Sequence, residues 1–327
     1  MVVSALLLSF APSMTSCRPP GTKVAQADEG GPQDAPQHGK APPRAKAKKG
    51  PVANPTHALT VAEANTFALA LINRDRAELG LAAVEWDETA AKSATRHAKD
   101  MVAHGVTAHW GTDGSTPEIR YTEAGGTHLA TENVGCLADA KPHTVRGAPF
   151  EPASIREFED RFFNEKPPAD GHRKNILDPR HTRVGVGFAA VEGFPIVCVV
   201  HEFIDDYGTY DPLPRRVKKG ERLTISGKMK APVVFGGIGI AFEPSPKPRT
   251  PDDLSKTGGY AMPSPFVSYF PAGYVTPLPV KIEGPSFSLE LPAGAEKGPG
   301  EYAVTIFVRF PGDKKLVPVS MRTVEVQ

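Results

Sequence analysis

The chain has 327 residues, enough for two domains of ordinary size, and 40% of them are hydrophobic. Its 38 basic and 37 acidic residues give a formal net charge of +1. This balance excludes the strong basic excess by which most nucleic-acid-binding proteins are recognised, so we expect no nucleic-acid partner.

The first 17 residues predict export. Residues 2–11 are apolar but too few to span a bilayer, as in a signal peptide. The sequence Met14-Thr15-Ser16-Cys17 resembles a bacterial lipobox, which would make Cys17 a lipidated first residue and a membrane anchor. Met14 stands where Leu is usual and no Lys or Arg precedes the run, so a misplaced start codon or an ordinary cleaved signal are the alternatives. We expect a lipid-anchored protein of the bacterial cell envelope, or a secreted one.

Residues 18–56 predict a disordered tether. From Arg18 to Pro55 there is no Phe, Trp, Tyr, Leu or Ile, so the segment buries too little apolar surface to offset the entropy of ordering it. It carries a basic cluster, which we interpret as a solvated charge run rather than a contact with an anionic surface. The cluster consists of Arg44, Lys46, Lys48 and Lys49.

Two helices follow the tether. Thr60 and Glu63 form a capping box that opens a helix to about Leu79, and Gly80 is placed to adopt the left-handed conformation that ends it. Its predicted buried stripe is Val61, Ala64, Ala68, Leu71 and Ile72.

Asp87 is expected to cap a second helix that ends at His104 before Gly105. The inward positions are Ala91, Ala94, Ala98, Met101 and Val102, and the small alanines predict a closely packed neighbour.

The next segments predict a loop, a short strand and a third helix. Residues 106–129 are rich in loop signals, and residues 131–135 are β-like. A capping box of Ser154 and Glu157 predicts a helix whose apolar face ends at Glu165. A carboxylate at the end of an apolar stripe is either paired, hydrogen-bonded or protonated, or it is simply the solvated end of the helix.

A hairpin completes the first domain. Val184, Val186 and Phe188 alternate with small residues, and after a turn residues 195–203 form an apolar run typical of a central strand. Helices with a late strand pair predict an α+β domain. Cys136 and Cys198 form an even pair in an exported chain, so a disulfide between them is expected.

Several motifs occur in a characteristic order. They are residues 71–76, Leu79-Gly80-Leu81, Trp86-Asp87, Ala108-His109, Thr131-Glu132-Asn133-Val134-Gly135, residues 171–177 (Gly-His-Arg-Lys-Asn-Ile-Leu) and Val184-Gly185-Val186-Gly187. Together they resemble the CAP superfamily, which includes cysteine-rich secretory proteins, antigen-five venom proteins, plant pathogenesis-related proteins and bacterial SCP-like proteins. The resemblance implies a CAP-type α-β-α sandwich over residues 57–210.

The resemblance also implies a central cleft with two histidines and two acidic residues. These are His109, Glu132, Glu165 and His172, with Phe162 where the family usually has Trp. By the same resemblance, His109 and His172 would hold zinc or another divalent metal, modestly and exchangeably. The alternative is a metal-free hydrogen-bond network.

Residues 212–327 predict a second domain of strands without helices, an immunoglobulin-like β-sandwich serving as a spacer or adhesion module. No catalytic cluster occurs in it. His201-Glu202 begins like a zinc-protease motif but lacks the second histidine and lies on a predicted strand.

The whole sequence therefore predicts an exported protein that binds a lipid, a glycan, a protein or another envelope component through the cleft. A metal-assisted hydrolase is the alternative, with a water activated at His109 and His172 and Glu132 or Glu165 as general base. A structural envelope protein is the third interpretation.

Overall fold

The computed structural model describes residues 44–327, except 137–140 and 193–196. The expected signal peptide, Cys17 and the first part of the tether lie outside the described residues. Within the described chain, no helix has the length and apolar character needed to cross a membrane.

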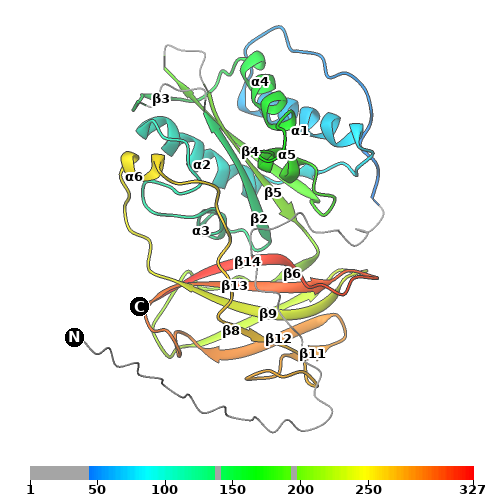
Figure 1. Ribbon diagram of the computed structural model, residues 1–327, viewed down its shortest axis with the longest axis vertical. Helices are drawn as coiled ribbons and strands as arrows, with labels where there is room; N and C mark the ends of the chain where they lie inside the picture. Colours follow the sequence, from blue (N-terminus) through cyan, green and yellow to red (C-terminus); the bar gives the residue numbers. More distant parts are fainter. Residues whose placement is uncertain (1–43, 137–140, 193–196) are drawn as a thin grey trace, which may run out of the picture.

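The first domain is α+β, as expected. Its elements in chain order are α1 (Val61–Glu78), β1 (Glu85–Trp86), α2 (Glu88–His104), α3 (Pro117–Glu123), β2 (Leu129–Cys136), β3 (Val145–Arg146), α4 (Pro152–Phe163), α5 (Gly171–Ile176), β4 (Arg183–Val191) and β5 (Val197–Asp205). The sheet has the strand order β1-β4-β5-β2, with β3 also paired to β4. Helix α2 covers one face of the sheet, and α1 and α4 pack on the other (Figure 1).

Alternation along β4 explains how the sheet carries a helix on each face. Val184 and Val186 point into the cluster formed with α1 and α4. Gly185 and Gly187 face α2, so closely that a Cβ on Gly187 would lie 2.1 Å from the backbone nitrogen of Thr95. Because successive strand residues point to opposite faces, this pattern gives one apolar face and one face flat enough for close helix packing.

The remaining strands form a sandwich. Its elements are β6 (Gly208–Tyr210), β7 (Arg216–Val217), β8 (Arg222–Met229), β9 (Val234–Glu243), α6 (Pro251–Ser255), β10 (Val267–Tyr269), β11 (Lys281–Glu283), β12 (Ser286–Pro292), β13 (Gly300–Arg309) and β14 (Val317–Val326). One sheet has the order β10-β9-β13-β14-β7 and the other β11-β12-β8-β6, with a shared apolar core. The hydroxyl of Tyr302 donates to Gly298 O at 2.7 Å, a tyrosine corner of the kind found in immunoglobulin-like domains.

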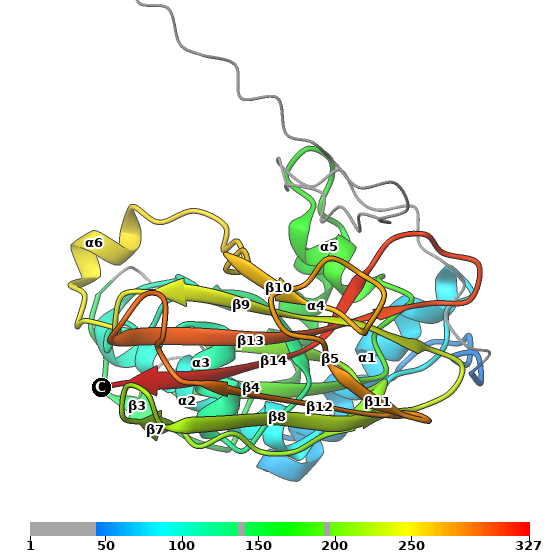
Figure 2. The ribbon, with the colours of Figure 1, turned by 90° about the horizontal axis from the view of Figure 1, so that it is seen from below.

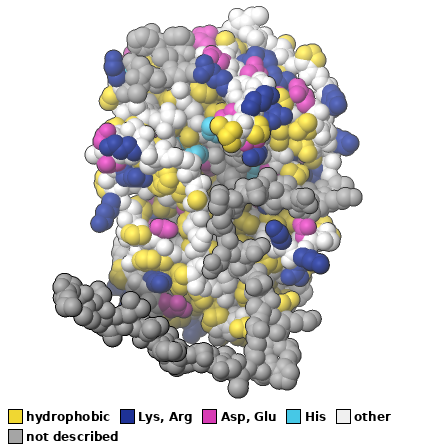
Figure 3. Space-filling view, viewed as in Figure 1, with side chains coloured by type: hydrophobic (Ala, Val, Ile, Leu, Met, Phe, Trp, Pro, Cys, Tyr) yellow, Lys and Arg dark blue, Asp and Glu magenta, His cyan; other side chains and the backbone are white. Residues whose placement is uncertain are grey.

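The two domains pack directly against each other. Leu129 of β2 lies in one apolar cluster with Ala303 and Met321 of the sandwich. The hydroxyl of Ser320 donates to Thr127 O at 2.6 Å. Figure 1 shows the first domain above the sandwich, and Figure 2 views the pair from the sandwich side. Figure 3 shows charged side chains of both signs spread over the face seen in Figure 1. The sandwich therefore shares buried surface with β2, the strand that carries Glu132.

The structure corrects the predicted extent of the tether. Residues 44–54 pack on the first domain, where Ala47 N donates to Leu81 O at 3.0 Å and Ala83 N donates to Ala45 O at 3.1 Å. The guanidinium of Arg44 donates to His181 O. Backbone pairing of this kind requires no large apolar side chain, so composition did not reveal it. At the other boundary, β6 pairs with β8, which places residues 208–210 in the sandwich.

The third helix also begins differently. It starts at Pro152, whose fixed φ suits the first helical position, so Ser154 lies inside the first turn and does not act as the N-cap. Because α4 ends at Phe163, Glu165 lies beyond the helix. Val61, predicted to be buried, is 54% exposed. The segment predicted as a loop contains α3, and the motif at residues 171–177 contains the short helix α5.

Candidate functional site

The first half of the site is the pair His109–Glu132. His109 follows α2 in a loop, and its Nδ1 lies 2.9 Å from Oε1 of Glu132 on β2. The other carboxylate oxygen accepts from Nη2 of Arg120 on α3 at 2.6 Å. The Arg120 and Glu132 side chains are each 1% exposed, whereas His109 is 16% exposed. Because a carboxylate only accepts, Nδ1 of His109 carries a proton, and Nε2 is the atom left for a ligand.

The charge of Glu132 is stabilised by its surroundings. Burial raises the pKa of Glu132, but Arg120, His97 and His109 lower it by more, to about 2. The ring of His97 is itself buried, and burial lowers its pKa to about 4. Its Nε2 lies 2.7 Å from Ala108 O, the residue before His109. At neutral pH the pair thus consists of a permanent carboxylate with an imidazole whose orientation is fixed.

The second half is the pair His172–Glu165. Nδ1 of His172 lies 2.5 Å from Oε1 of Glu165, and its backbone N–H donates to Oε2 at 2.9 Å. The carboxylate therefore holds both the ring and the start of α5 in place. The ring of Phe162 packs on the imidazole with centroids 4.3 Å apart. His172 is 29% exposed and Glu165 is 23% exposed, so this pair is more open than the first.

Two adjacent residues of β2 connect the two His–Glu pairs to one strand. Glu132 contacts His109, and the next residue, Asn133, donates from Nδ2 to His172 O at 3.2 Å. Asn133 is 1% exposed and also accepts from Asn175 at 2.9 Å. Within the described residues, no hydrogen bond or ion pair joins the two pairs directly, and no three His, Cys, Asp or Glu side chains come together as a metal site.

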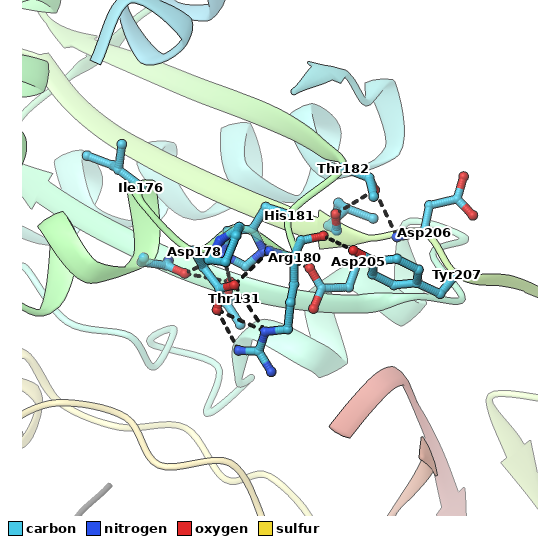
Figure 4. Close-up of polar contacts among 12 residues, drawn as sticks. Thr131, Ile176, Asp178, Arg180, His181, Thr182, Asp205, Asp206 and Tyr207 are labelled. Carbon is cyan, nitrogen blue, oxygen red and sulfur yellow. Dashed lines mark hydrogen bonds and ion pairs between the residues drawn. The ribbon is translucent and has the colours of Figure 1, made fainter. Parts of the chain in front are cut away.

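A second histidine–carboxylate network, centred on His181, adjoins the site through Asn175 (Figure 4). The sequence analysis did not predict it. Nδ1 of His181 lies 2.7 Å from Asp205, and its Nε2 lies 3.0 Å from Oδ1 of Asn175. The hydroxyl of Thr131 donates to the same oxygen at 2.8 Å. His181 is 2% exposed. The network links β2, α5 and the end of β5, and no motif spacing could have indicated it because its members come from three separate segments.

His201 and Glu202 are interior residues of β5. The hydroxyl of Ser93 donates to Glu202 at 2.6 Å, and burial together with Glu132 raises the pKa of Glu202 well above its usual value. Burial and the charge of His172 lower the pKa of His201 to about 3. As consecutive strand residues, the two side chains point to opposite faces of the sheet, Glu202 toward Ser93 of α2 and His201 toward Phe162 of α4. They have the character of core polar groups, not of a zinc-protease motif.

Cys136 and Cys198 lie opposite each other on β2 and β5 and are joined by a disulfide, with Cα atoms 4.1 Å apart. The bond lies at the end of the strand pair that carries Glu132.

A match to one protein family agrees with the architecture of the first domain. Residues 69–201 match CAP, the cysteine-rich secretory protein family. Among solved structures, the chain is similar to an extracellular protein containing an SCP domain from Bacillus anthracis str. Ames, with 23% identity and a TM-score of 0.34. That similarity covers 46% of this chain and 45% of the other, so the chain spans less than half of that protein. No curated protein matches the chain.

Proposed function

Because the chain is a member of the CAP superfamily through residues 69–201, we propose that it is an exported protein that binds a component of the cell envelope. The binding groups are the imidazoles of His109 and His172. In this proposal, Cys17 carries the lipid that holds the protein at the membrane.

One observation carries the proposal. Both imidazoles use Nδ1 for a carboxylate, and both remain partly exposed, at 16% and 29%. Each ring is therefore fixed in one tautomer and orientation, with Nε2 available to an external partner. Recognition benefits from groups that are already ordered, since no side-chain entropy is lost when the ligand binds.

A divalent metal would have Nε2 of His109 and of His172 as its protein ligands, with Glu132 and Glu165 as the hydrogen-bond partners of the two rings. When bound, such a metal supplies a Lewis acid for a ligand carbonyl or hydroxyl. Catalytic zinc sites use three protein ligands, whereas this donor set provides two imidazoles. We therefore favour weak, exchangeable metal binding in a recognition site over a metal-dependent hydrolase.

Calorimetric titration of the purified Cys17→Ser chain with zinc tests this function. We expect binding in the micromolar-to-millimolar range that is lost in the variant His109→Ala/His172→Ala. His57→Ala is the matched control, because His57 forms an exposed pair with Glu63 at 3.1 Å outside the site. Equal heats in all three proteins would refute a role for the two site histidines. Membrane fractionation that is unchanged by Cys17→Ser would refute the anchor.

A further inference from the structure

A pocket lies at the junction of the two domains, beside His109. Its volume is about 520 Å³, and its wall comes from both the CAP domain and the sandwich. Trp110 follows His109 directly, and Tyr260 lies between β9 and β10 of the sandwich. The ring of Tyr260 packs edge-on against Trp110 at 5.1 Å and lies 6.4 Å from the ring of His109. The pocket thus adjoins the first half of the His–Glu site.

The β9–β10 connection, residues 244–266, is anchored to the CAP domain at several points. Arg249 N donates to Thr112 O at 2.8 Å. Leu254 is fully buried against Val106 and Ala108. The Tyr260 hydroxyl donates to Glu118 of α3. Figure 1 shows this connection rising from the sandwich to the helices above it. These anchors hold the sandwich's part of the pocket in a fixed position.

The lining of the pocket combines aromatic rings with charges of both signs. Arg249 lies 5.3 Å from the ring centroid of Trp110. No protein acceptor takes its side-chain N–H groups within the described residues, so they are available to a ligand. Glu243 provides an exposed carboxylate at the rim. Burial raises the pKa of both Glu118 and Glu301 on the wall. The lining also contains Lys247, so its two basic residues offset most of the charge of its three glutamates. The small net charge disfavours strongly anionic and strongly cationic ligands.

We propose that this junction pocket binds a neutral, polyhydroxylated ligand, namely sugar rings of a glycan, next to His109. The aromatic rings of Trp110 and Tyr260 suit the apolar face of a pyranose, and Arg249 and Glu243 suit its hydroxyl groups. The volume of about 520 Å³ is within the range of roughly 300–1,000 Å³ of small-ligand sites. This inference rests on the proposed binding function and names its ligand class. It makes the sandwich a part of the binding site.

Fluorescence titration tests the proposal directly, because the chain has two tryptophans, Trp86 and Trp110. In a Trp86→Phe/Cys17→Ser chain, emission reports on Trp110 alone. The probes are the tetramer of β-1,4-linked N-acetylglucosamine, cellotetraose, oleate and inorganic phosphate. We expect a saturable change with at least one oligosaccharide and none with oleate or phosphate. Saturation by oleate or phosphate alone, or no saturation with any probe up to about millimolar concentration, would overturn the proposal.

Variants locate the binding site. Arg249→Ala and Tyr260→Ala should each weaken oligosaccharide binding at least about tenfold, since each removes a principal contact. Lys297→Ala is the matched control, because Lys297 also lies 5.3 Å from an aromatic centroid, that of Phe266, but outside the pocket. If the Tyr260→Ala variant does not fold, the oligosaccharide affinity of Arg249→Ala alone tests the location of the site. Equal binding in Arg249→Ala and Lys297→Ala would contradict the assignment.

These experiments test the glycan pocket separately from the proposed role of the two histidines. Zinc binding that depends on His109 together with no oligosaccharide binding would reject the pocket and keep the His–Glu site. Oligosaccharide binding that depends on Arg249 but not on His109→Ala/His172→Ala would keep the pocket and reject the histidines as binding groups.

Discussion

The buried pair Arg120–Glu132 should be a principal determinant of both stability and site geometry. Both side chains are 1% exposed and 2.6 Å apart, and Arg120 also donates to Ser115 O at 2.9 Å and His109 O at 3.0 Å. Arg120→Met keeps an unbranched side chain, shorter than that of Arg, and removes these N–H groups. It leaves the Glu132 carboxylate buried with His109 as its remaining side-chain partner.

Removal of one partner of a buried ion pair costs about 3–5 kcal/mol, and we expect Arg120→Met to lose about 4 kcal/mol of unfolding free energy at neutral pH. Glu132→Gln should be similarly destabilising, because it leaves Arg120 unpaired. The double variant should be less unstable than the sum of the two by about 2 kcal/mol, since it leaves no unpaired charge. Arg96→Met is the control: Arg96 pairs with Glu123 but is 45% exposed, so its loss should cost less than about 1 kcal/mol.

Urea unfolding followed by circular dichroism measures these differences, and pH gives an independent check. The pKa of Glu132 is about 2 in the folded protein and 4.5 ordinarily, so its charge contributes stability above about pH 4.5 that is lost as the pH falls toward 2. About 1 kcal/mol of this contribution should be gone at about pH 3.5 in the wild type. Arg120→Met lacks the main cause of the lowering, so its deficit should shrink on acidification. Additive single variants with a deficit independent of pH would refute this account.

Three further predictions concern packing, the disulfide and acid stability. Gly185→Ala should lower the midpoint of thermal unfolding, because the new Cβ would lie 2.1 Å from a backbone nitrogen of α2. Gly171→Ala is the control and should leave the midpoint unchanged, because a Cβ there would have nothing within 4 Å. Equal midpoints in the two variants would contradict the packing argument. The disulfide of Cys136 and Cys198 closes a separation of 62 residues, so the double serine variant should lose about 4 kcal/mol of unfolding free energy and become insensitive to reductant. Burial lowers the pKa of His97 from 6.5 to about 4, so stability that is complete above about pH 6.5 should fall by about 1.4 kcal/mol per pH unit toward pH 4. His97→Gln should reduce this dependence of the unfolding free energy on pH, measured by urea unfolding at several pH values. An unchanged dependence would contradict the assignment to His97.

Local signals in the sequence predicted helix ends correctly where all the residues that form the cap lie in one segment. The capping box of Thr60 and Glu63 is present, and Asp87 caps α2 through Ala90 N at 2.9 Å. Gly105 ends α2 with a left-handed φ of 65°. The CAP fold expected from ordered motifs is confirmed over residues 69–201. Each of these features depends on residues that are near in the chain or on a pattern that the family shares.

The features that sequence reasoning missed depend on distant partners. Arg120 lies in a helix that was predicted as a loop, and its role depends on a carboxylate 12 positions away on β2. His181 had no recognisable spacing, because its partner Asp205 is 24 positions away. Tyr260 reaches the site from the second domain. In each case the contact is set by tertiary packing, which periodicity and capping rules do not describe.

The register of β2 determines which residues of the site lie together. Thr131, Glu132 and Asn133 are consecutive on β2, and they contact the His181 network, His109 and the His172 backbone respectively. Because strand residues alternate between faces, a slip of one position would move Glu132 away from His109 and put Asn133 in its place. The disulfide joins β2 to β5 at the directly opposed pair that follows three positions after Asn133, and therefore fixes this register covalently. The sandwich packs on the other end of β2 at Leu129. The strand that positions both His–Glu pairs is thus held at each end, by the disulfide and by the second domain.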